Sequence, residues 1–441
     1  MYPDPAAQSA RFHERARRVI PDGVSRGTLT VNPYPIYAAR GSGAWVTDVD
    51  GNRYLDANNN YTALILGHAN PAVTAALAAQ LASGTAFSFA TAEELALAEL
   101  LCERVPGFER IRFCNSGTEA VLTAIKAARG FTGRPLIAKF EGAYHGAYDW
   151  AEVSLDSQPA NWGSPAAPAA VPYAVGTPAS VAAEMLVLPY NDADAVRALI
   201  GSAGERLAAV VIDTLASRAG MPTPTEEFLA AVVEATRSVG ALLIADEVIT
   251  FRLGRGGHQA QLGLRPDLTT LGKIIGGGLP VGAVAGRADV MAVFEASGGA
   301  RARVPAGGTF SANSLTMVAG RACLEQLDDA AFERLASMGA TVRSELNRFL
   351  ADADRGGQVT GEGSLFRLHP HRRAVRGYRD ARHSAAEAQF MAQVHRELLN
   401  RSVYLTTYGM GCLSLAMTDA DIELLVAAVK QAWVTTSETP R

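Results

Sequence analysis

The chain has 441 residues, of which 48% are hydrophobic and 19% are charged, and its formal net charge is −4. This length exceeds the roughly 250–300 residues at which one hydrophobic core stops growing, so we expect at least two domains. The weak negative charge gives no indication of a nucleic-acid-binding surface. The four cysteines form no C-x-x-C pair, so we expect no disulfide framework and no metal site.

The termini and the hydropathy profile carry no membrane signal. The first residues, MYPDPAAQSARFHERARR, lack the apolar segment of a signal peptide. No stretch approaches the roughly 18 consecutive apolar residues of a membrane-spanning helix. We therefore expect a cytoplasmic protein that binds neither membranes nor nucleic acids.

The N-terminal part is predicted to combine short helices with a β-hairpin. Residues 8–20 have an amphipathic helical pattern that stops at Pro21-Asp22-Gly23. The stretch GAWVTDVDGNRYLDA, at 43–57, alternates apolar and polar residues around Asp50-Gly51, which is typical of a hairpin. Helical patterns follow at about 71–83 and 91–105.

The middle of the chain alternates strands with helices. The predicted strands are RIRF, PLIAKF, AAVVID, ALLIAD and LTTLG, and helical patterns follow RIRF and precede ALLIAD. Residues 153–185 are rich in Pro, Ala, Ser and Gly, so we expect a long irregular loop there. The alternation predicts an α/β fold with a mainly parallel sheet covered by helices.

The pattern changes after about residue 312. Two long helical segments precede the strand GSLFRLHPH, and a further helix, the strand segment VYLTTYGMGCLSLAM and a last helix complete the chain. This order predicts a smaller α+β domain. We expect residues 61–311 to form the large domain, 312–441 to form the small domain, and 1–60 to join the small domain.

Polar residues follow several of the predicted strands, at the sheet edge where α/β proteins bind ligands. Asn115, Ser116, Gly117 and Thr118 follow RIRF after one cysteine and open a helix. Backbone N–H groups at a helix start attract anions such as phosphate, although an ordinary helix cap is the commoner explanation. Tyr144 and His145, after IAKFEGA, form either an aromatic platform or a packing pair.

An acid and a lysine end two further strands. Asp246 follows the apolar run ALLIA, and a buried carboxylate there requires a cation or hydrogen-bond donors. Glu247 is adjacent, and the sequence leaves open which of the two acids faces inward. Lys273 follows LTTLG, and a desolvated lysine at a strand end can act as a nucleophile, although a solvated loop lysine is more common.

Taken together, these features have the composition of a pyridoxal 5′-phosphate (PLP) site. A helix start suits the phosphate, an aromatic side chain suits the ring, an acid pairs with the pyridinium nitrogen, and a lysine forms the Schiff base. The acid and the lysine would then hold opposite ends of one electron-accepting group.

The motifs NSGTEA, GAYHG, ADEVITFR, LTTLGKIIGGGLPVGAVAGRADVM and GGTFSANSLTM resemble those of class III PLP-dependent aminotransferases. The resemblance covers nearly the whole chain and is nearest to the glutamate-1-semialdehyde aminomutases and the β-phenylalanine aminotransferases. It implies fold type I: a large, mainly parallel seven-stranded mixed sheet, a small α+β domain, and a homodimer with shared active sites.

The resemblance also implies residue roles. Lys273 would form the Schiff base and move the proton, and Asp246 would keep the pyridine nitrogen protonated. Ser116, Gly117 and Thr118 would bind the phosphate, Tyr144 would stack on the ring beside His145, and Thr309 would reach the phosphate of the partner subunit's cofactor. Arg26 would bind a substrate carboxylate, and Tyr61 would form an aromatic wall.

Three departures from the family pattern affect the substrate. Ile212-Asp213-Thr214 stands where the family usually has V-E-P, and Ser217-Arg218-Ala219 stands where the aminomutases have G-N-M. Arg218 would either approach the cofactor's phenolic oxygen or a substrate carboxylate, or point to solvent. Tyr408 occupies the position of a switchable arginine, and the 153–185 loop is longer than expected.

We expect an aminotransferase that moves an amino group from an amino acid, with a β- or aryl amino acid as the favoured donor, to a keto acid. The small-molecule partners would be an amino donor and a carbonyl acceptor. A 2,1-aminomutase, a racemase and a PLP-binding protein without turnover remain as alternatives. A dinucleotide-binding oxidoreductase is disfavoured because no G-x-G-x-x-G motif follows a strand.

Overall fold

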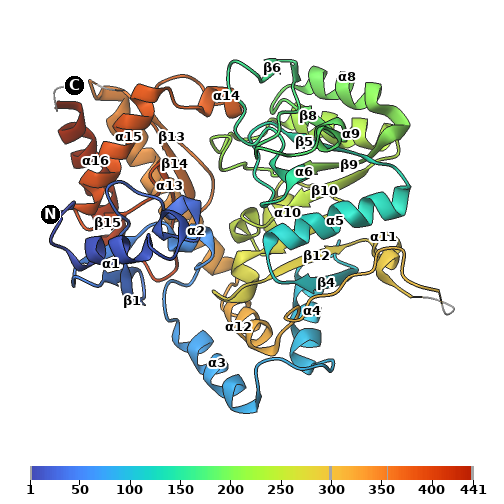
Figure 1. Ribbon diagram of the computed structural model, residues 1–441, viewed down its shortest axis with the longest axis horizontal. Coiled ribbons are helices and arrows are strands. Elements are labelled where there is room, and N and C mark those ends of the chain that lie inside the picture. The colour runs from blue at the N-terminus through green and yellow to red at the C-terminus, as the bar shows by residue number, and fades with distance from the viewer. Residues whose placement is uncertain (1, 297–299, 355, 439–441) are drawn as a thin grey trace. The chain divides into compact units, whose positions relative to one another are not determined.

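The computed structural model describes residues 2–296, 300–354 and 356–438, and Figure 1 labels the elements in chain order. Two compact units emerge from the contacts. Unit 1 consists of the described parts of Met1–Pro71, Arg334–Arg372 and His383–Arg441, and unit 2 consists of those of Ala72–Glu333 and Arg373–Arg382. Among the described residues, no helix combines the length and apolarity needed to cross a membrane.

Unit 2 is built on a seven-stranded sheet with the order β4-β12-β11-β10-β9-β5-β8. Only β12 runs antiparallel to its neighbours β11 and β4, so the predicted mixed, mainly parallel sheet is confirmed. The strands are β4 (Arg110–Cys114), β5 (Leu136–Phe140), β8 (Met185–Leu188), β9 (Leu207–Ile212), β10 (Leu242–Asp246), β11 (Leu268–Gly272) and β12 (Gly282–Gly286).

Helices cover both faces of this sheet (Figure 1). Successive strand residues point to opposite faces, so neighbouring residues enter different cores. Val211 and Ile244 pack in the core that includes α5 (Gly117–Thr132). Val210 and Leu243 pack in the other core, against α8 (Ala193–Ala203) and α9 (Glu226–Ser238).

The 153–185 segment of unit 2 is more regular than the sequence indicated. It contains the short hairpin β6 (Gly163–Ser164) and β7 (Ala167–Pro168) and the helix α7 (Ala179–Ala183). The Ser154 hydroxyl donates to the Ala169 carbonyl at 2.7 Å and accepts from the Val171 N–H at 2.9 Å. Side-chain-to-backbone bonds of this kind replace a longer strand ladder, which explains why composition alone suggested an irregular loop.

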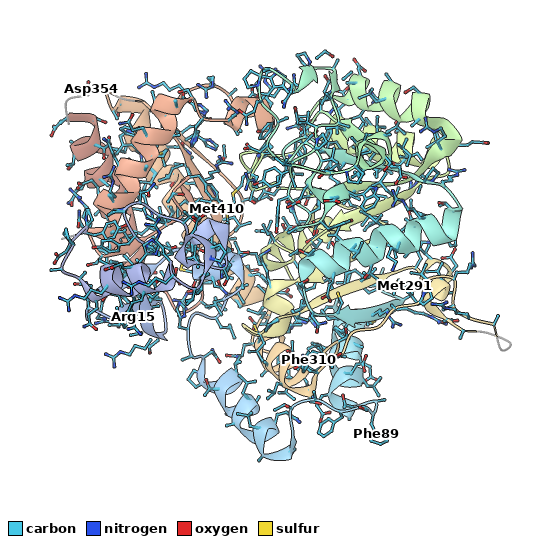
Figure 2. The ribbon with its side chains drawn as sticks, in the orientation of Figure 1. Arg15, Phe89, Met291, Phe310, Asp354 and Met410 are labelled. Atoms are coloured by element: carbon cyan, nitrogen blue, oxygen red, sulfur yellow. The ribbon has the colours of Figure 1, made fainter. Side chains whose placement is uncertain are left out.

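The remaining helices and turns of unit 2 surround the sheet. Figure 2 shows their side chains on the same ribbon. These helices and turns are α3 (Pro71–Ser83, whose first residue is assigned to unit 1), α4 (Ala92–Arg104), α6 (Asp149–Glu152), α10 (Gly257–Gln261), α11 (Ala288–Met291), α12 (Ser314–Leu324), α14 (Tyr378–Ala381), and the short 3-10 turns η3 (Gly204–Arg206), η4 (Thr250–Leu253), η5 (Lys273–Gly276) and η6 (Ala292–Phe294).

Unit 1 contains two small sheets, with the orders β1-β2-β3-β15 and β13-β14-β16. The predicted hairpin at 43–57 is confirmed, because β2 and β3 pair antiparallel across Asp50-Gly51. The strands are β1 (Ala38–Ser42), β2 (Trp45–Asp48), β3 (Arg53–Asp56), β13 (Gln358–Thr360), β14 (Leu365–His369), β15 (Val403–Tyr404) and β16 (Met410–Cys412).

The helices of unit 1 complete its core. Phe390 of α15 packs edge-on against Trp433 of α16, with ring centroids 4.9 Å apart. Ser384 and Glu387 form a capping box that starts α15 where the sequence predicted a helix. The elements are α1 (Gln8–Ala16), η1 (Pro21–Gly23), η2 (Gly27–Leu29), α2 (Asn59–Thr62), α13 (Asp329–Asp352, which begins in unit 2), α15 (Ala385–Leu399) and α16 (Asp419–Glu438).

Candidate active site

Polar residues follow five strands of the seven-stranded sheet at one common edge. Strands β4, β5, β9, β10 and β11 all run in the same direction, because β12 alone is reversed. The segments that follow them begin with Asn115, Glu141, Asp213, Glu247 and Lys273. Because carboxyl ends of parallel strands meet at one sheet edge, this edge is the expected ligand site of an α/β sheet.

Asp246 is the last residue of β10 and is 5% exposed. Its Oδ2 lies 2.6 Å from Nδ1 of His145. Its Oδ1 accepts hydrogen bonds from the Thr270 hydroxyl at 2.9 Å and from the Val248 N–H at 3.1 Å. Asp246 and Thr270 are direct neighbours on the parallel strands β10 and β11. These donors compensate a carboxylate that would otherwise be costly to bury.

His145 is buried, and burial lowers its pKa while the adjacent Asp246 acts against that decrease. A neutral imidazole satisfies this arrangement if Nδ1–H donates to the Asp246 carboxylate. The Nε2 atom of His145 is buried and has no hydrogen-bond partner among the described residues. A buried polar atom of this kind suits a site that receives another polar group.

Glu247 belongs to a different cluster, which answers the question of the two adjacent acids. Its carboxylate accepts from the backbone N–H groups of His258 at 3.0 Å and Gln259 at 2.7 Å, at α10. Burial raises its pKa, and these hydrogen bonds act in the opposite direction. Glu247 therefore anchors α10, and Asp246 is the acid that contacts His145.

Asp213 follows β9, next to β10 in the sheet, and is almost fully buried. Burial, followed by the negative charge of Asp246, raises the pKa of Asp213 to about 8. Its Oδ1 accepts from the Leu215 N–H at 3.0 Å. At neutral pH the site therefore holds Asp213 in its protonated form.

Lys273 follows β11 directly and begins the turn η5. Its φ of 51° places it in the left-handed region, which non-glycine residues rarely adopt and which often marks functional sites. The positive charge of Lys273 acts on the Asp213 carboxyl and opposes the rise of its pKa, after burial and the Asp246 charge. The predicted lysine and acid thus end neighbouring strands, β11 and β10.

The start of α5 provides a predicted anion site. Ser116 caps the helix, and its hydroxyl accepts from the Glu119 N–H at 3.1 Å. The first N–H groups of a helix lack intrahelical acceptors, so those of Gly117 and Thr118 are available to an anion. A Cβ at Gly117 would lie 2.8 Å from a methyl of Val248, so only glycine fits there without movement of that side chain.

The loop that carries Tyr144 and His145 packs on the same helix start. The Thr118 hydroxyl accepts from the Ala147 N–H at 3.2 Å. Gly146 has a φ of 104°, and a Cβ there would lie 2.7 Å from the Cα of Thr118. The close approach of the two backbones explains the glycine in the sequence GAYHG.

Tyr144 and Arg218 lie within electrostatic reach of one another. Burial raises the pKa of Tyr144, while a hydrogen bond with Thr118 and the positive charge of Arg218 act against the rise. Tyr144 still exposes 42% of its surface, and Arg218 is partly exposed. Thr309 is also exposed, two residues before Ser311, whose hydroxyl lies 3.4 Å from Asn115 Nδ2.

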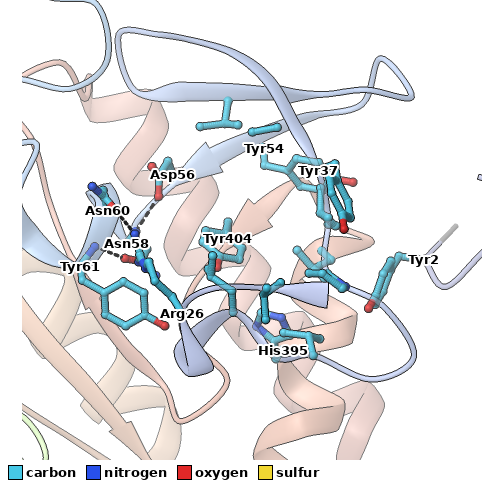
Figure 3. A pocket seen from close by; sticks show the side chains of 18 of the residues that line it. Tyr2, Arg26, Tyr37, Tyr54, Asp56, Asn58, Asn60, Tyr61, His395 and Tyr404 are labelled. Carbon is cyan, nitrogen blue, oxygen red and sulfur yellow. Dashed lines mark hydrogen bonds between the residues drawn. The ribbon is translucent and has the colours of Figure 1, made fainter. Parts of the chain in front are cut away.

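Unit 1 contains a separate cavity of about 560 Å³ that brings Arg26 and Tyr61 together (Figure 3). The Arg26 guanidinium lies 5.1 Å from the centre of the Tyr61 ring and donates to Asn60 Oδ1 at 2.7 Å. The Tyr61 hydroxyl donates to the Thr28 carbonyl at 2.9 Å. Most of the remaining lining is apolar or aromatic, and it includes Val24, Leu29, Val31, Ile36, Leu64 and Tyr404.

An unusual backbone turn positions this group. Asn59, Asn60, Tyr61 and Thr62 all have positive φ angles, between 49° and 75°. Asparagine tolerates the left-handed conformation better than most residues, so the run of asparagines before Tyr61 suits the turn. The Asp56 carboxylate accepts from the Asn58 and Asn59 N–H groups and holds the turn in place.

Tyr408 lies in the turn before β16 and is outside the lining of this cavity. The Arg367 guanidinium lies 5.4 Å from the centre of the Tyr408 ring, and the Tyr408 hydroxyl contacts Met410 Sδ at 3.5 Å. The structure therefore groups Arg26 with Tyr61, and Tyr408 with Arg367.

Comparison with known proteins identifies the family. Residues 28–432 match the model of aminotransferase class-III. An ω-transaminase from Sphaerobacter thermophilus is 49% identical, with a TM-score of 0.96 and 99% of both chains covered. A β-phenylalanine aminotransferase from Variovorax paradoxus is 39% identical, with a TM-score of 0.87 over 98% of this chain and 95% of that one.

Another relative is named for a different activity. The glutamate-1-semialdehyde 2,1-aminomutase from Methanothermobacter thermautotrophicus is 40% identical over 427 residues, which covers 96% of this chain and 98% of the relative. The chain thus belongs to the class III aminotransferase family and has the fold of type I PLP-dependent enzymes. Members of this family depend on PLP.

The residues at the sheet edge fit this cofactor. The start of α5 offers N–H groups to a phosphate, Asp246 offers a buried carboxylate to a pyridinium, and His145 has a buried nitrogen without a partner. The sequence led to the prediction of Asp246 and Lys273 from the strand ends, but it gave no indication of Thr270 and Val248, which contact Asp246. The register of two apolar strands, ALLIAD and LTTLG, would have placed Thr270 beside Asp246.

Proposed function

We propose that the protein is an aminotransferase that moves an amino group from an amino acid to a keto acid. The observation that carries this proposal is that Asp246, held by His145 and Thr270, and Lys273 stand at the ends of two neighbouring parallel strands. PLP, when bound, supplies an electron-accepting ring that stabilises negative charge on the carbon next to the transferred nitrogen. The protein supplies binding, orientation and proton transfer.

Asp246 is the proposed partner of the pyridine nitrogen. Three donors, from His145, Thr270 and Val248, stabilise its carboxylate, and the raised pKa of Asp213 leaves that neighbour neutral. These donors hold the Asp246 carboxylate in a buried position from which it would favour a protonated ring nitrogen. The departure from the usual V-E-P motif at Asp213 is compatible with this division of charge.

Lys273 is the proposed point of attachment and proton carrier, acting through Nζ. Ser116, Gly117 and Thr118 are proposed to bind the phosphate at the start of α5, where the helix dipole adds to the attraction. Tyr144 is proposed to cover the ring, with Arg218 beside it to add positive charge. Thr309 is proposed to contact the phosphate of a partner subunit's cofactor.

The proposed donor is a β- or aryl amino acid. Arg26 offers a guanidinium that can hold a carboxylate, and it lines a mainly apolar cavity with Tyr61. The name of one similar structure, a β-phenylalanine aminotransferase, supports a donor of this kind. Tyr408 is proposed to influence the acceptor, as the aromatic residue in place of a switchable arginine.

A 2,1-aminomutase is the second candidate, and it is favoured by the names of the curated relatives at 40% identity. Such an enzyme would use the same proton carrier but retain its intermediate and need no separate acceptor. The two activities differ in whether a keto product leaves the protein.

A half-reaction separates the two candidates. The PLP-loaded protein is mixed, without an acceptor, with 3-amino-3-phenylpropanoate or with 1-phenylethylamine, which has the phenyl group and amine but lacks the carboxylate. We expect stoichiometric pyridoxamine phosphate and a free keto product from the amino acid, and a much slower reaction with the amine. Recovery of only an isomer of the donor would contradict the aminotransferase and support a mutase or a racemase.

A further inference from the structure

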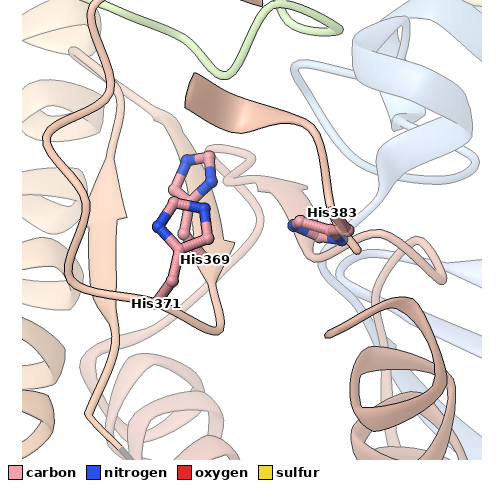
Figure 4. Close-up of side chains that lie close together, drawn as sticks. All are labelled: His369, His371 and His383. Atoms are coloured by element: carbon pink, nitrogen blue, oxygen red, sulfur yellow. The ribbon is translucent and has the colours of Figure 1, made fainter. Parts of the chain in front are cut away.

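Three histidines of unit 1 form a cluster that the proposed transamination does not use. His369 ends β14, His371 follows two residues later, and His383 stands just before α15. One side-chain nitrogen from each residue lies within 4.8 Å of the other two. Figure 4 shows His369 and His371 side by side, with the His383 ring directed toward them.

The local sequence accounts for the arrangement. Residues i and i+2 of an extended segment lie on the same side, so the order His-Pro-His directs both imidazoles one way. The ring centroids are 5.5 Å apart for His369 and His371, and 6.4 Å and 6.3 Å from each of these to His383. His369 and His371 are buried, and His383 is partly exposed. Three imidazoles thus converge on a sheltered position with one side open.

We propose that His369, His371 and His383 bind one divalent transition-metal ion, with Zn²⁺ as the metal. Imidazole nitrogen is a preferred ligand of Zn²⁺, and three histidines leave a fourth position for water. Zn–N bonds of about 2.0–2.1 Å separate tetrahedral ligand nitrogens by roughly 3.4 Å. A small inward movement, chiefly of the partly exposed His383, brings the three nitrogens to that spacing.

Neighbouring residues support the ligand form of the imidazoles. Thr360 Oγ1 lies 2.9 Å from Nε2 of His369, and a hydroxyl at this position orients the ring as outer-shell partners of metal-bound histidines do. Neutral imidazole is the form that binds metal. The guanidinium of Arg372, the residue after His371, donates to the Ala351 and Ala353 carbonyls.

The ion would tie together two points of the chain. The chain leaves unit 1 after Arg372 and re-enters it at His383. An ion held by His369, His371 and His383 links the strand before this excursion to the residue after it, and a crosslink that closes a loop restricts the unfolded chain. This crosslink goes beyond the proposed transamination, and the sequence motifs had suggested no metal site.

The test is Zn²⁺ binding by the PLP-loaded protein, produced without a histidine tag, stripped of metal and freed of excess PLP. Zn²⁺ is titrated in competition with a chromophoric zinc indicator, and the Zn-loaded sample is examined by X-ray absorption. We expect one ion per chain, three imidazole ligands at about 2.0–2.1 Å, and a Tm that rises on Zn²⁺ addition.

Variants assign the site. His383→Ala and the conservative His371→Gln should each weaken Zn²⁺ binding by about 100-fold or more, and His13→Ala, which removes an imidazole outside the cluster, should leave it unchanged. Because His383 is partly exposed, its alanine variant should keep the fold and the PLP absorbance. Absence of Zn²⁺ binding by the unmodified chain, or equal affinity in the His383→Ala protein, would overturn the proposal.

Discussion

The two buried acids at the sheet edge, Asp213 and Asp246, have different environments. Asp246 accepts hydrogen bonds from three donors, whereas the Oδ1 of Asp213 accepts one backbone N–H. Two carboxylates near each other in a dry site do not ionise together readily, and fewer hydrogen-bond donors favour the protonated form of Asp213. Burial, followed by the charge of Asp246, raises the pKa of Asp213 to about 8, so Asp213 is protonated at neutral pH.

The pH dependence of stability tests the protonated state of Asp213. The usual pKa of 3.8 applies to the unfolded chain, and the folded value is about 8. Between these values the folded state binds the extra proton, so the Asp213 contribution to stability is lost as pH rises. In the cofactor-free protein, the Tm of Asp213→Asn relative to the unmodified chain should increase from pH 5 to pH 8. A constant difference in Tm would show that Asp213 is ionised throughout.

Substitutions of the adjacent acids Asp246 and Glu247 test which of the two faces the pyridine nitrogen. Asp246→Asn removes the charge proposed to face the pyridine nitrogen and should lower kcat by about 100-fold or more. Glu247→Gln removes a charge that holds α10, so it should lower the Tm and change kcat less. Steady-state kinetics and thermal denaturation of both variants measure these effects. A larger loss of kcat in Glu247→Gln than in Asp246→Asn would show that Glu247 is the acid that faces the ring nitrogen.

At the scale of elements, the strand ends were predictable and the turns between them were not. The runs ALLIA and LTTLG are apolar, and a polar residue at the end of each has one plausible place, the sheet edge. Strand β12 was missed because GAVAG lacks the bulky residues that mark a strand. Its glycines are explained by close contacts, since a Cβ at Gly282 would lie 2.0 Å from the Ser116 carbonyl oxygen.

The left-handed turn at Asn59–Thr62, in the candidate substrate cavity, is a second feature that the sequence did not predict. The sequence suggested Arg26 and Tyr61 separately, from a resemblance, whereas their stacking depends on four successive positive φ angles. Local propensity does not predict such a run, because each residue in it costs about 1–2 kcal/mol in isolation. The hydrogen bonds from Asn58 and Asn59 to Asp56 offset part of that cost.

A pair of substitutions at Asn60 isolates the backbone contribution of this turn. Asn60→Gly and Asn60→Ala both remove the amide that contacts Arg26, but only glycine adopts a φ of 49° without strain. The alanine variant should therefore be less stable than the glycine variant by about 1 kcal/mol. Urea denaturation of the two proteins measures the difference, and equal stability would show that the left-handed turn does not form in solution.

Among the described residues of unit 2, several large apolar side chains are exposed to solvent. Phe89 and Phe310 are 85% and 62% exposed, and Phe87 and Leu95 are also exposed. Helix α4, which contains Leu95, packs against α12, which follows Phe310. Exposed apolar patches mark interaction sites. We propose that a second copy of the chain covers these four side chains.

The proposed dimer predicts a specific loss of assembly. Sedimentation velocity should show a dimer for the unmodified protein and a shift toward monomer for the double variant Phe89→Asp, Phe310→Asp. Because Thr309 is proposed to reach the partner subunit's cofactor, the same variant should also bind PLP more weakly. The exposed Val19, in unit 1, provides the control substitution Val19→Asp. A monomeric unmodified protein with full activity would contradict a shared active site.

The attachment of PLP to Lys273 can be measured directly. The PLP-loaded protein is reduced with borohydride, digested and analysed by mass spectrometry for lysines that carry the phosphopyridoxyl group. The chain has only three other lysines, Lys126, Lys139 and Lys430, and the Lys139 ammonium is enclosed by the Ala143, Ala151 and Val153 carbonyls. We predict near-complete modification of Lys273 and none after Lys273→Ala. Modification of another lysine instead, or of none, would contradict the account.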